Sequence, residues 1–273
     1  MKKTISERLG CSTITFRHNT LFEALDNIAN AGLKKVDIAC IPGFCPHIDP
    51  LEITEQEVQG LLNHLQDNGQ SVSTLNISAG GLNTDRKDFV YRFIKAAIPL
   101  AARLGCYAIT IPTGSKVNNA ELWEENAHTS SKLIDDLASI AEANGVRVTL
   151  EAPHPGTLAE TVTDSRRFFE LLQDQRVGCT FDTSHVARGN QTPVQNCILE
   201  IGAKIGHVHF RDCIGENNHL TPGKGDIDYQ SVIDELNRTG YRGDLILELE
   251  GEDASLAAEE LAFAIRHIKS LEA

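Results

Sequence analysis

The feature that most constrains this fold is a repeated order along the chain: a helical stretch, a glycine, a short apolar run and a loop. Gly32 and Gly69, for example, each follow a helical stretch and suit the left-handed residue just past a helix end. The apolar runs that come next are typical of strands. Eight strand-then-helix units recur at intervals of about 25 to 40 residues, which is the rhythm of parallel-sheet proteins.

The expected elements follow from this order. Asn19 or Thr20 is expected to cap the first helix, and Thr163 or Asp164 the fifth. Strands are predicted at 9–16, 35–40, 71–77, 107–111, 146–151, 177–182, 206–210 and 244–249, with helices at 20–31, 54–68, 86–104, 119–144, 164–173, 194–204, 229–239 and 256–271.

Eight such units predict an α/β fold of the (β/α)₈ TIM-barrel type, with a closed parallel sheet and one domain over residues 1–273. The competing architecture is a doubly wound open sheet. That fold usually carries a glycine-rich phosphate turn after its first strand, and residues 11–15 form no such turn. The closed barrel is therefore favoured.

Charge and cysteine content limit the partners and the compartment. The formal net charge of -13 repels polyphosphate backbones, so nucleic acid is not expected as a partner. No apolar stretch approaches the length of a membrane span, and polar residues follow Met1-Lys2-Lys3 where a signal peptide needs an apolar run. Seven irregularly spaced cysteines indicate reduced thiols. We expect a cytoplasmic protein that does not bind membranes.

Potential metal ligands stand at the carboxyl ends of four successive predicted strands. These ends carry Glu151, Asp182, His209 and Glu248. Because barrel enzymes place their catalytic groups at the carboxyl ends of the strands, we interpret the four residues as one site. Singly, each has a simpler interpretation, such as a solvated loop carboxylate, a cap or a core histidine. Three oxygen donors and one imidazole fit one divalent ion, Mn²⁺, Mg²⁺ or Co²⁺, without excluding Zn²⁺.

Further polar residues follow these strand ends. His185 comes three residues after Asp182, and His154 three after Glu151. His207 points to the same side of its strand as His209 but lies deeper, so we expect a hydrogen-bonded core residue. The candidate substrate-binding residues are His154, His185, Arg211, His219 and Lys224; His154 has an equally plausible structural role, and Lys224 can equally be a solvated loop charge.

These segments resemble the xylose isomerase-like TIM barrel superfamily, in particular its sugar (phosphate) isomerase and epimerase branch. The matching segments are Leu150-Glu151, Phe181-Asp182-Thr183-Ser184-His185, His207-Val208-His209-Phe210-Arg211-Asp212, residues 222–229, residues 240–243 and Ile246-Leu247-Glu248. The resemblance implies metal ligation by Glu151, Asp182, His209 and Glu248, with His185 and the 211–219 loop contacting substrate. It also implies that Glu151 and Glu248 are the catalytic acid/base pair.

One departure from the family concerns an arginine of the seventh loop that binds substrate oxygens. His219 occupies its approximate position here, which affects the expected substrate more than the chemistry. Related barrels commonly pair through surface helices and loops, so the resemblance implies a homodimer or a homotetramer. The expected substrate is a small sugar-like molecule, and the sequence does not reveal whether it carries phosphate.

The expected activity is that of a metal-dependent sugar isomerase or epimerase. A proton next to a carbonyl is removed readily only when the enediolate that forms is stabilised, and a metal ion provides that stabilisation. Three alternatives remain. A dehydratase of a hydroxylated acid would use the same first step. An apurinic endonuclease needs further histidines where this chain has Asn76-Ile77-Ser78 and Thr110-Ile111-Pro112. The third is a non-catalytic sugar-binding barrel.

Overall fold

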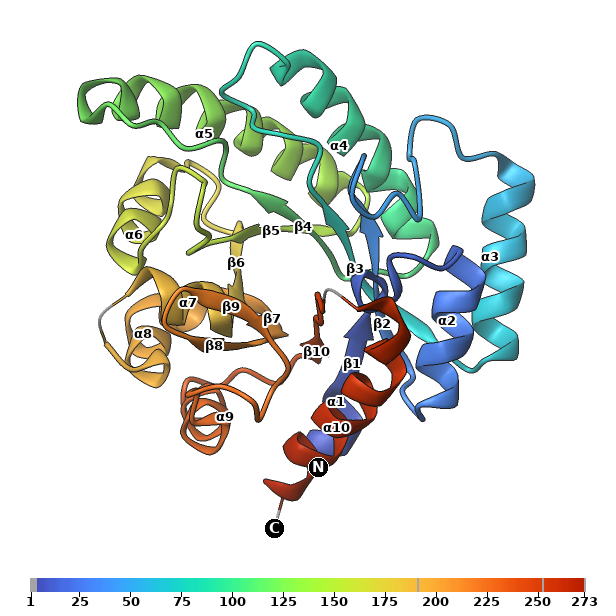
Figure 1. The fold of residues 1–273 in the computed structure, drawn as a ribbon. Coiled ribbons are helices and arrows are strands. Elements are labelled where there is room, and N and C mark those ends of the chain that lie inside the picture. Colours follow the sequence, from blue (N-terminus) through green and yellow to red (C-terminus); the bar gives the residue numbers. More distant parts are fainter. Residues whose placement is uncertain (1–3, 191, 252, 273) are drawn as a thin grey trace.

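A computed structural model describes residues 4–190, 192–251 and 253–272. Eight parallel strands in this part of the chain close into a barrel in the order β1-β10-β7-β6-β5-β4-β3-β2, and helices surround it (Figure 1). Every neighbouring pair is parallel, and β1 bonds to both β2 and β10, so the ring is complete. The predicted closed barrel is confirmed.

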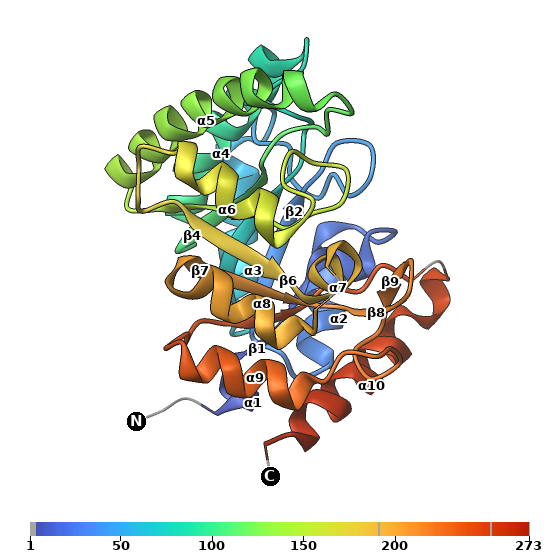
Figure 2. The same cartoon turned by 90° about the vertical axis from the view of Figure 1, so that its left-hand side faces the viewer.

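The barrel strands are short and their central residues are buried. Their bounds are β1 Leu9–Ser12, β2 Lys35–Cys40, β3 Ser71–Ile77, β4 Ala108–Pro112, β5 Arg147–Glu151, β6 Gly178–Asp182, β7 Ile205–Phe210 and β10 Leu245–Leu247. An antiparallel hairpin of β8 Asp212–Ile214 and β9 Asn217–Leu220 follows β7 and lies beside α7 Thr183–Gly189 (Figure 2).

The helices begin at the caps that the sequence offers. The hydroxyl groups of Thr20 and Thr54 each accept the backbone N–H of a glutamate three residues later, and that glutamate's carboxylate accepts the threonine N–H, which fixes the starts of α2 and α3. Besides α7, the described α-helices are α1 Ile5–Arg8, α2 Leu21–Asn30, α3 Glu55–Asp67, α4 Lys87–Arg103, α5 Ala120–Ala143, α6 Val162–Leu171, α8 Val194–Ile201, α9 Tyr229–Arg238 and α10 Ala257–Ser270. No helix in the described ranges has the length and apolar character needed to cross a membrane.

Several predicted boundaries are wrong for local reasons. The cap of α6 is Thr161, because its hydroxyl and the Asp164 carboxylate each accept the other's backbone N–H. The first strand ends at Ser12, whose hydroxyl accepts the Ile14 N–H and begins the 3₁₀ helix Thr13–Phe16. The predicted eighth strand, 244–249, is reduced to β10, so Glu248 lies just past it. The short helices α1 and α7 and the β8–β9 hairpin were not predicted.

Hydroxyl groups fill part of the barrel interior below the strand ends. Thr110 and Thr149 each lie within hydrogen-bond distance of Thr180, at 2.9 and 2.8 Å between hydroxyl oxygens. The three residues are buried and come from three adjacent strands, β4, β5 and β6. In this layer the buried hydroxyl groups are hydrogen-bonded to one another, directly below the residues at the strand ends.

The packing of β1 against β2 generates the first prediction. A Cβ at Gly10 would lie 2.5 Å from the Lys35 carbonyl oxygen and 2.6 Å from Ile246, so we expect Gly10→Ala to destabilise the fold by about 1–3 kcal/mol. Gly60, inside α3, has open space at that position, and Gly60→Ala should stabilise by roughly 0.5–1 kcal/mol. Urea unfolding of both variants checks this pair, and equal stabilities would contradict it.

Candidate metal and proton-transfer site

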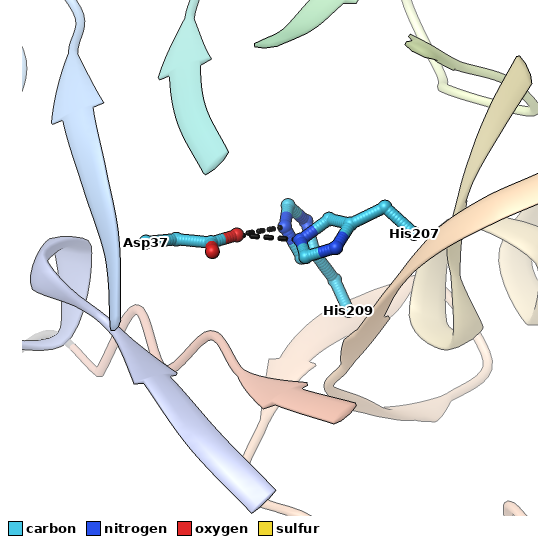
Figure 3. Close-up of side chains that lie close together, drawn as sticks. All are labelled: Asp37, His207 and His209. Atoms are coloured by element: carbon cyan, nitrogen blue, oxygen red, sulfur yellow. Dashed lines mark hydrogen bonds and ion pairs between the residues drawn. The ribbon is translucent and has the colours of Figure 1, made fainter. Parts of the chain in front are cut away.

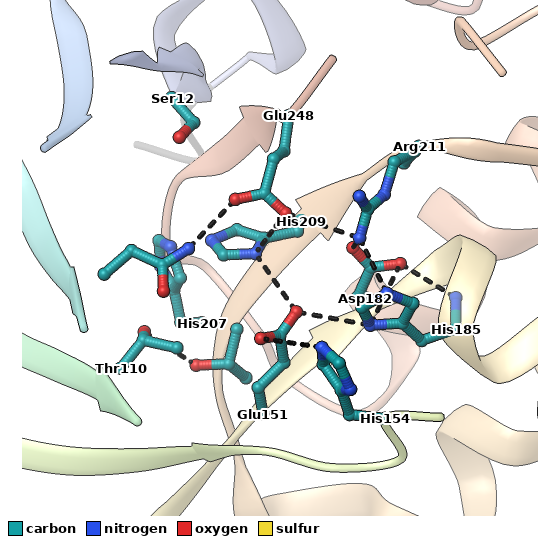
Figure 4. Close-up of polar contacts among 12 residues, drawn as sticks. Ser12, Thr110, Glu151, His154, Asp182, His185, His207, His209, Arg211 and Glu248 are labelled. Carbon is teal, nitrogen blue, oxygen red and sulfur yellow. Dashed lines mark hydrogen bonds and ion pairs between the residues drawn. The ribbon is translucent and has the colours of Figure 1, made fainter. Parts of the chain in front are cut away.

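Four side chains at the carboxyl ends of the strands meet in one small volume. Glu151 and Asp182 are the last residues of β5 and β6, His209 is near the end of β7, and Glu248 follows β10. Each offers one ligand atom within 4.8 Å of the others, and Figure 4 shows them converging from their separate strands. The structure therefore brings together the predicted set, whose role as metal ligands stays a prediction.

Local hydrogen bonds orient the carboxylates. Asp182 Oδ1 accepts the backbone N–H groups of Ser184 and His185 at 2.8 and 2.9 Å, so Asp182 also caps α7. Glu248 Oε1 accepts an amide N–H of Asn76 at 2.9 Å. The second oxygens face positively charged or nitrogen-bearing groups: Asp182 Oδ2 lies 2.9 Å from Arg211, and Glu248 Oε2 lies 3.4 Å from His209 Nδ1. Capping and metal ligation are thus compatible roles for different oxygens of Asp182.

His209 shows that the site suits a cation. Its Nδ1 is buried, has no hydrogen-bond partner among the described residues, and lies 3.4 Å from Glu248 Oε2 and 3.9 Å from Glu151 Oε1. Burial disfavours the imidazolium ion, but Glu248 and Asp37 raise the pKa of His209 well above its ordinary value. The carboxylates therefore attract positive charge to Nδ1, where a divalent ion and a proton would compete. Three carboxylates and one imidazole suit such an ion.

Arg211 compensates the buried negative charge. Its guanidinium lies 2.9 Å from Asp182 Oδ2 and 3.5 Å from Glu248 Oε2, and it also pairs with Glu250. Burial favours neutral carboxylic acids, but Arg211 holds the pKa of Asp182 at about 2 and, together with His219, that of Glu250 at about 2. Arg211 is predicted as a substrate-binding residue; its side chain is buried and is engaged mainly by these carboxylates.

Two histidines beside Glu151 present different atoms to the site. Arg211 donates to His185 Nε2 at 2.8 Å, so the neutral ring carries its hydrogen on Nδ1, which lies 3.3 Å from Glu151 Oε1. His154 Nδ1 donates to the Pro155 carbonyl at 2.7 Å, which leaves a lone pair on Nε2, 3.8 Å from Glu151 Oε2. Burial and His185 lower the pKa of His154. One hydrogen-bond donor and one acceptor therefore flank Glu151.

A cavity of about 440 Å³ opens onto this site. Glu151 lines this cavity together with four of the five predicted substrate-binding residues, His154, His185, Arg211 and His219. His219 is half exposed and its Nδ1 lies 3.2 Å from Glu250 Oε2. Lys224 does not line this cavity. Its ammonium group pairs with Glu260 at 2.6 Å and borders a neighbouring pocket, consistent with the solvated interpretation.

Comparison with family models gives a match over residues 25–271 to the xylose isomerase-like TIM barrel. The chain belongs to this family. Among curated relatives, the rhizopine catabolism protein MocC of Rhizobium meliloti is 30% identical over 148 residues, covering 48% of this chain and 43% of MocC. The inosose dehydratase of Serratia proteamaculans is 28% identical over 156 residues, covering 50% and 52%. These matches span about half the length of each relative.

Solved structures with the same fold cover nearly the whole chain. A D-psicose 3-epimerase of Clostridium cellulolyticum, determined with D-tagatose, superposes with a TM-score of 0.80 at 17% identity over 97% of this chain and 99% of that one. The IOLI protein, whose structure holds a zinc atom, gives 0.79 at 20% identity over 96% and 98%. At these identities the comparisons establish the shared fold.

Sequence reasoning missed three residues that shape the site. Asn76 contacts Glu248, Glu250 contacts Arg211, and Asp37 contacts His209. Asn76 lies near the end of the predicted strand 71–77, where its residue type indicated only that the histidine needed by an apurinic endonuclease is missing. Glu250 follows Glu248 by two residues, a spacing that placed it near the same strand end. The two histidine partners of Asp37 lie 170 and 172 residues away, and no local pattern indicates them.

Removing Arg211 tests the charge balance. Arg211→Met should destabilise the metal-free protein by about 3–5 kcal/mol, because buried Asp182 and partly buried Glu250 lose their partner. Added Mn²⁺ should restore part of that stability, since a cation would replace the missing positive charge. Arg211→Lys retains a positive charge and should lose less. Thermal unfolding with and without Mn²⁺ measures the effect; an unchanged Arg211→Met protein would refute it.

Proposed function

We propose that this protein is a divalent-metal-dependent isomerase or epimerase that moves a proton beside the carbonyl of a small sugar-like substrate. The observation that carries the proposal is the convergence of Glu151 and Glu248, from strands three positions apart around the barrel, on the site with Asp182 and His209. Two carboxylates arriving from different sides suit removal and return of a proton on different faces of one carbon.

The ligand set consists of Glu151, Asp182, His209 and Glu248. When bound there, a divalent ion would act as an electrophile that stabilises the developing enediolate. Asp182 and His209 are fully buried, so this part of the site excludes bulk water. Electrostatic interactions are stronger in such surroundings than in water. The neighbouring protein groups then decide which substrate atoms can approach the carboxylates.

In the proposed reaction, Glu151 accepts the proton and Glu248 returns one, with the roles exchanged in the reverse direction. Glu151 is present as the carboxylate, the form that can accept a proton, because His154, His185 and His209 overcome the effect of burial and hold its pKa well below the ordinary value. Asn76 holds one Glu248 oxygen in place. His185 Nδ1–H and His154 Nε2 supply a donor and an acceptor for substrate hydroxyl groups on the cavity wall.

The cavity itself supports a small polar substrate. Its volume of about 440 Å³ lies within the usual range for small-molecule sites. Polar groups are spread around its wall, which suits a molecule with several hydroxyl groups. They include Asn76, Ser78, Ser115, Thr157, Asn218 and Glu250.

Dehydration of a hydroxylated ring is a second candidate. It is favoured by the curated relatives named inosose dehydratase, one of which, from Lactiplantibacillus plantarum, matches 93% of this chain at 24% identity. Dehydration begins with the same proton abstraction and continues with loss of hydroxide. The two reactions differ only after the shared intermediate has formed.

Metal content provides the first test of the function. The purified protein should bind about one divalent ion per chain, and chelation should abolish its activity and lower its thermal stability, because the folded state alone assembles the ligand set. Elemental analysis and thermal unfolding with EDTA measure both. A protein that is native and active without a divalent ion would refute the proposal.

Proton exchange in D₂O tests the chemistry. With a panel of ketoses and inososes, the native protein should incorporate deuterium beside the carbonyl, and NMR would distinguish an epimer or isomer from a dehydrated product. Glu151→Gln and Glu248→Gln should each lower exchange by about 10²–10⁴-fold, because each removes a proton carrier.

Glu55→Gln is a suitable control for these variants, because Glu55 lies on the exposed face of α3 and pairs with Arg103. It should retain normal exchange. Full exchange in Glu151→Gln would exclude Glu151 as the base. Binding without exchange on the whole panel would favour a non-catalytic sugar-binding barrel.

A further inference from the structure

A buried network lies directly beneath the candidate metal site. Asp37, on β2, extends across the barrel interior towards His207 and His209 on β7, which is three strand positions away (Figure 3). Asp37, His207 and His209 are all completely buried. None of them is among the residues that line the cavity, so the network is separated from the proposed substrate.

The hydrogen bonds fix which ring nitrogens carry hydrogen. Asp37 Oδ2 lies 2.6 Å from His207 Nε2 and 3.1 Å from His209 Nε2. A carboxylate can only accept, so both Nε2 atoms must donate. The other nitrogen of His207, Nδ1, lies 2.5 Å from the Tyr107 hydroxyl, which can donate to it. Apart from His209 Nδ1, the polar side-chain atoms of this network then each have a suitable partner.

The same assignment determines what His209 offers to the metal site. With its hydrogen held on Nε2 by Asp37, the neutral ring has its lone pair on Nδ1. That is the unpartnered atom that faces Glu151 and Glu248. Nδ1 is therefore both correctly directed and chemically able to bind a cation. Residues that hydrogen-bond to a metal-ligating histidine commonly set its tautomer and ring orientation in this way.

We propose that Asp37 is a positioning residue for the metal centre, which holds His209 with Nε2–H inward and the Nδ1 lone pair towards the carboxylates. The proposal rests on the proposed metal-dependent function. It adds a residue from the opposite part of the barrel that touches neither the cation nor the substrate. On the other side of Asp37, Tyr107 hydrogen-bonds to His207 and His207 hydrogen-bonds to Asp37. Neither contacts Nδ1 of His209, the atom that would bind the metal.

A second cation among Asp37, His207 and His209 is the competing interpretation. Their ligand atoms lie within 4.8 Å of one another. However, both Nε2 atoms approach the same carboxylate oxygen at hydrogen-bond distances, and Asp37 Oδ1 accepts the Thr74 backbone N–H at 3.2 Å. With both Nε2 atoms protonated, neither imidazole has a lone pair directed at Asp37. The geometry therefore points to hydrogen bonding within this cluster.

Asp37→Asn is a specific test because its orientation is constrained. The Thr74 N–H favours the amide oxygen at the Oδ1 position, so the amide NH₂ would face His209 Nε2. That arrangement favours hydrogen on Nδ1, the atom that must bind the cation. We expect the dissociation constant for Mn²⁺ or Co²⁺ to rise by about 10–100-fold in Asp37→Asn, as measured by competition with a chelator.

Tyr107→Phe is the matched control. It removes a buried hydrogen bond from the same network, but on the His207 side, and it leaves the Asp37–His209 contact intact. The dissociation constant should change by less than about threefold, since the deleted group does not touch His209. An equal loss of affinity in Tyr107→Phe and Asp37→Asn would mean that general disruption of the core explains the effect, and would overturn the proposal.

A spectroscopic measurement keeps the proposal falsifiable even if Asp37→Asn fails to fold. In native protein labelled with ¹⁵N-histidine, loading with diamagnetic Zn²⁺ should shift one imidazole whose Nδ1 binds the metal and whose Nε2 carries hydrogen. Binding through Nε2 would overturn the proposal. Failure of the native protein to bind any divalent ion would instead refute the proposed function. If the native protein binds the ion and Asp37→Asn binds it with the same affinity, only the role of Asp37 is refuted.

Discussion

The structure depends on placing several carboxylates at the carboxyl ends of the barrel strands, where burial largely removes them from water. Glu151, Asp182 and Glu248 are buried within a few ångströms of one another. An arrangement of this kind is tolerable only when positive charge and hydrogen-bond donors compensate it. Arg211 supplies a fixed charge, and His209 offers a position that a proton or a divalent ion would occupy.

Ring closure makes this compensation possible. The groups that orient the acidic cluster come from the far side of the barrel: Asn76 on β3 binds Glu248 beyond β10, and Asp37 on β2 binds His209 on β7. In an open sheet these strands would lie apart. Closing the sheet places their inward side chains in contact, so the same geometry that buries the core also orients the candidate catalytic groups.

The arrangement also explains why one family can include enzymes with different names. Removing a proton beside a carbonyl needs only a base and a means of stabilising the resulting negative charge, and under the proposed function the strand ends would provide both. The outcome then depends on the next group to donate a proton or lose hydroxide. If the proposed function holds, that choice would rest with His154, His185 and the residues around Glu250, which line the cavity beyond the strand ends.

Much of the fold and the centre of the site were readable in the sequence. Burial gives each strand an apolar run, reciprocal caps such as Thr20 and Thr54 mark helix starts, and the strand-end positions of Glu151, Asp182, His209 and Glu248 follow from that order. These are local signals, which depend on residues close together in the chain. The predicted boundaries are wrong where a hydrogen bond from a side chain to the backbone ends a strand early, as at Ser12, or begins a helix early, as at Thr161.

Only the tertiary structure decided which partners orient those four residues. The pairing of Arg211 with Glu250, the bond from Asn76 to Glu248 and the contact of Asp37 with both histidines join residues that are distant in the sequence. Their positions depend on the register of strands around the closed ring and on which nitrogens carry hydrogen. The sequence by itself therefore determined the types of the candidate ligands and their common end of the barrel. Closure of the barrel determined their partners, orientation and charge balance.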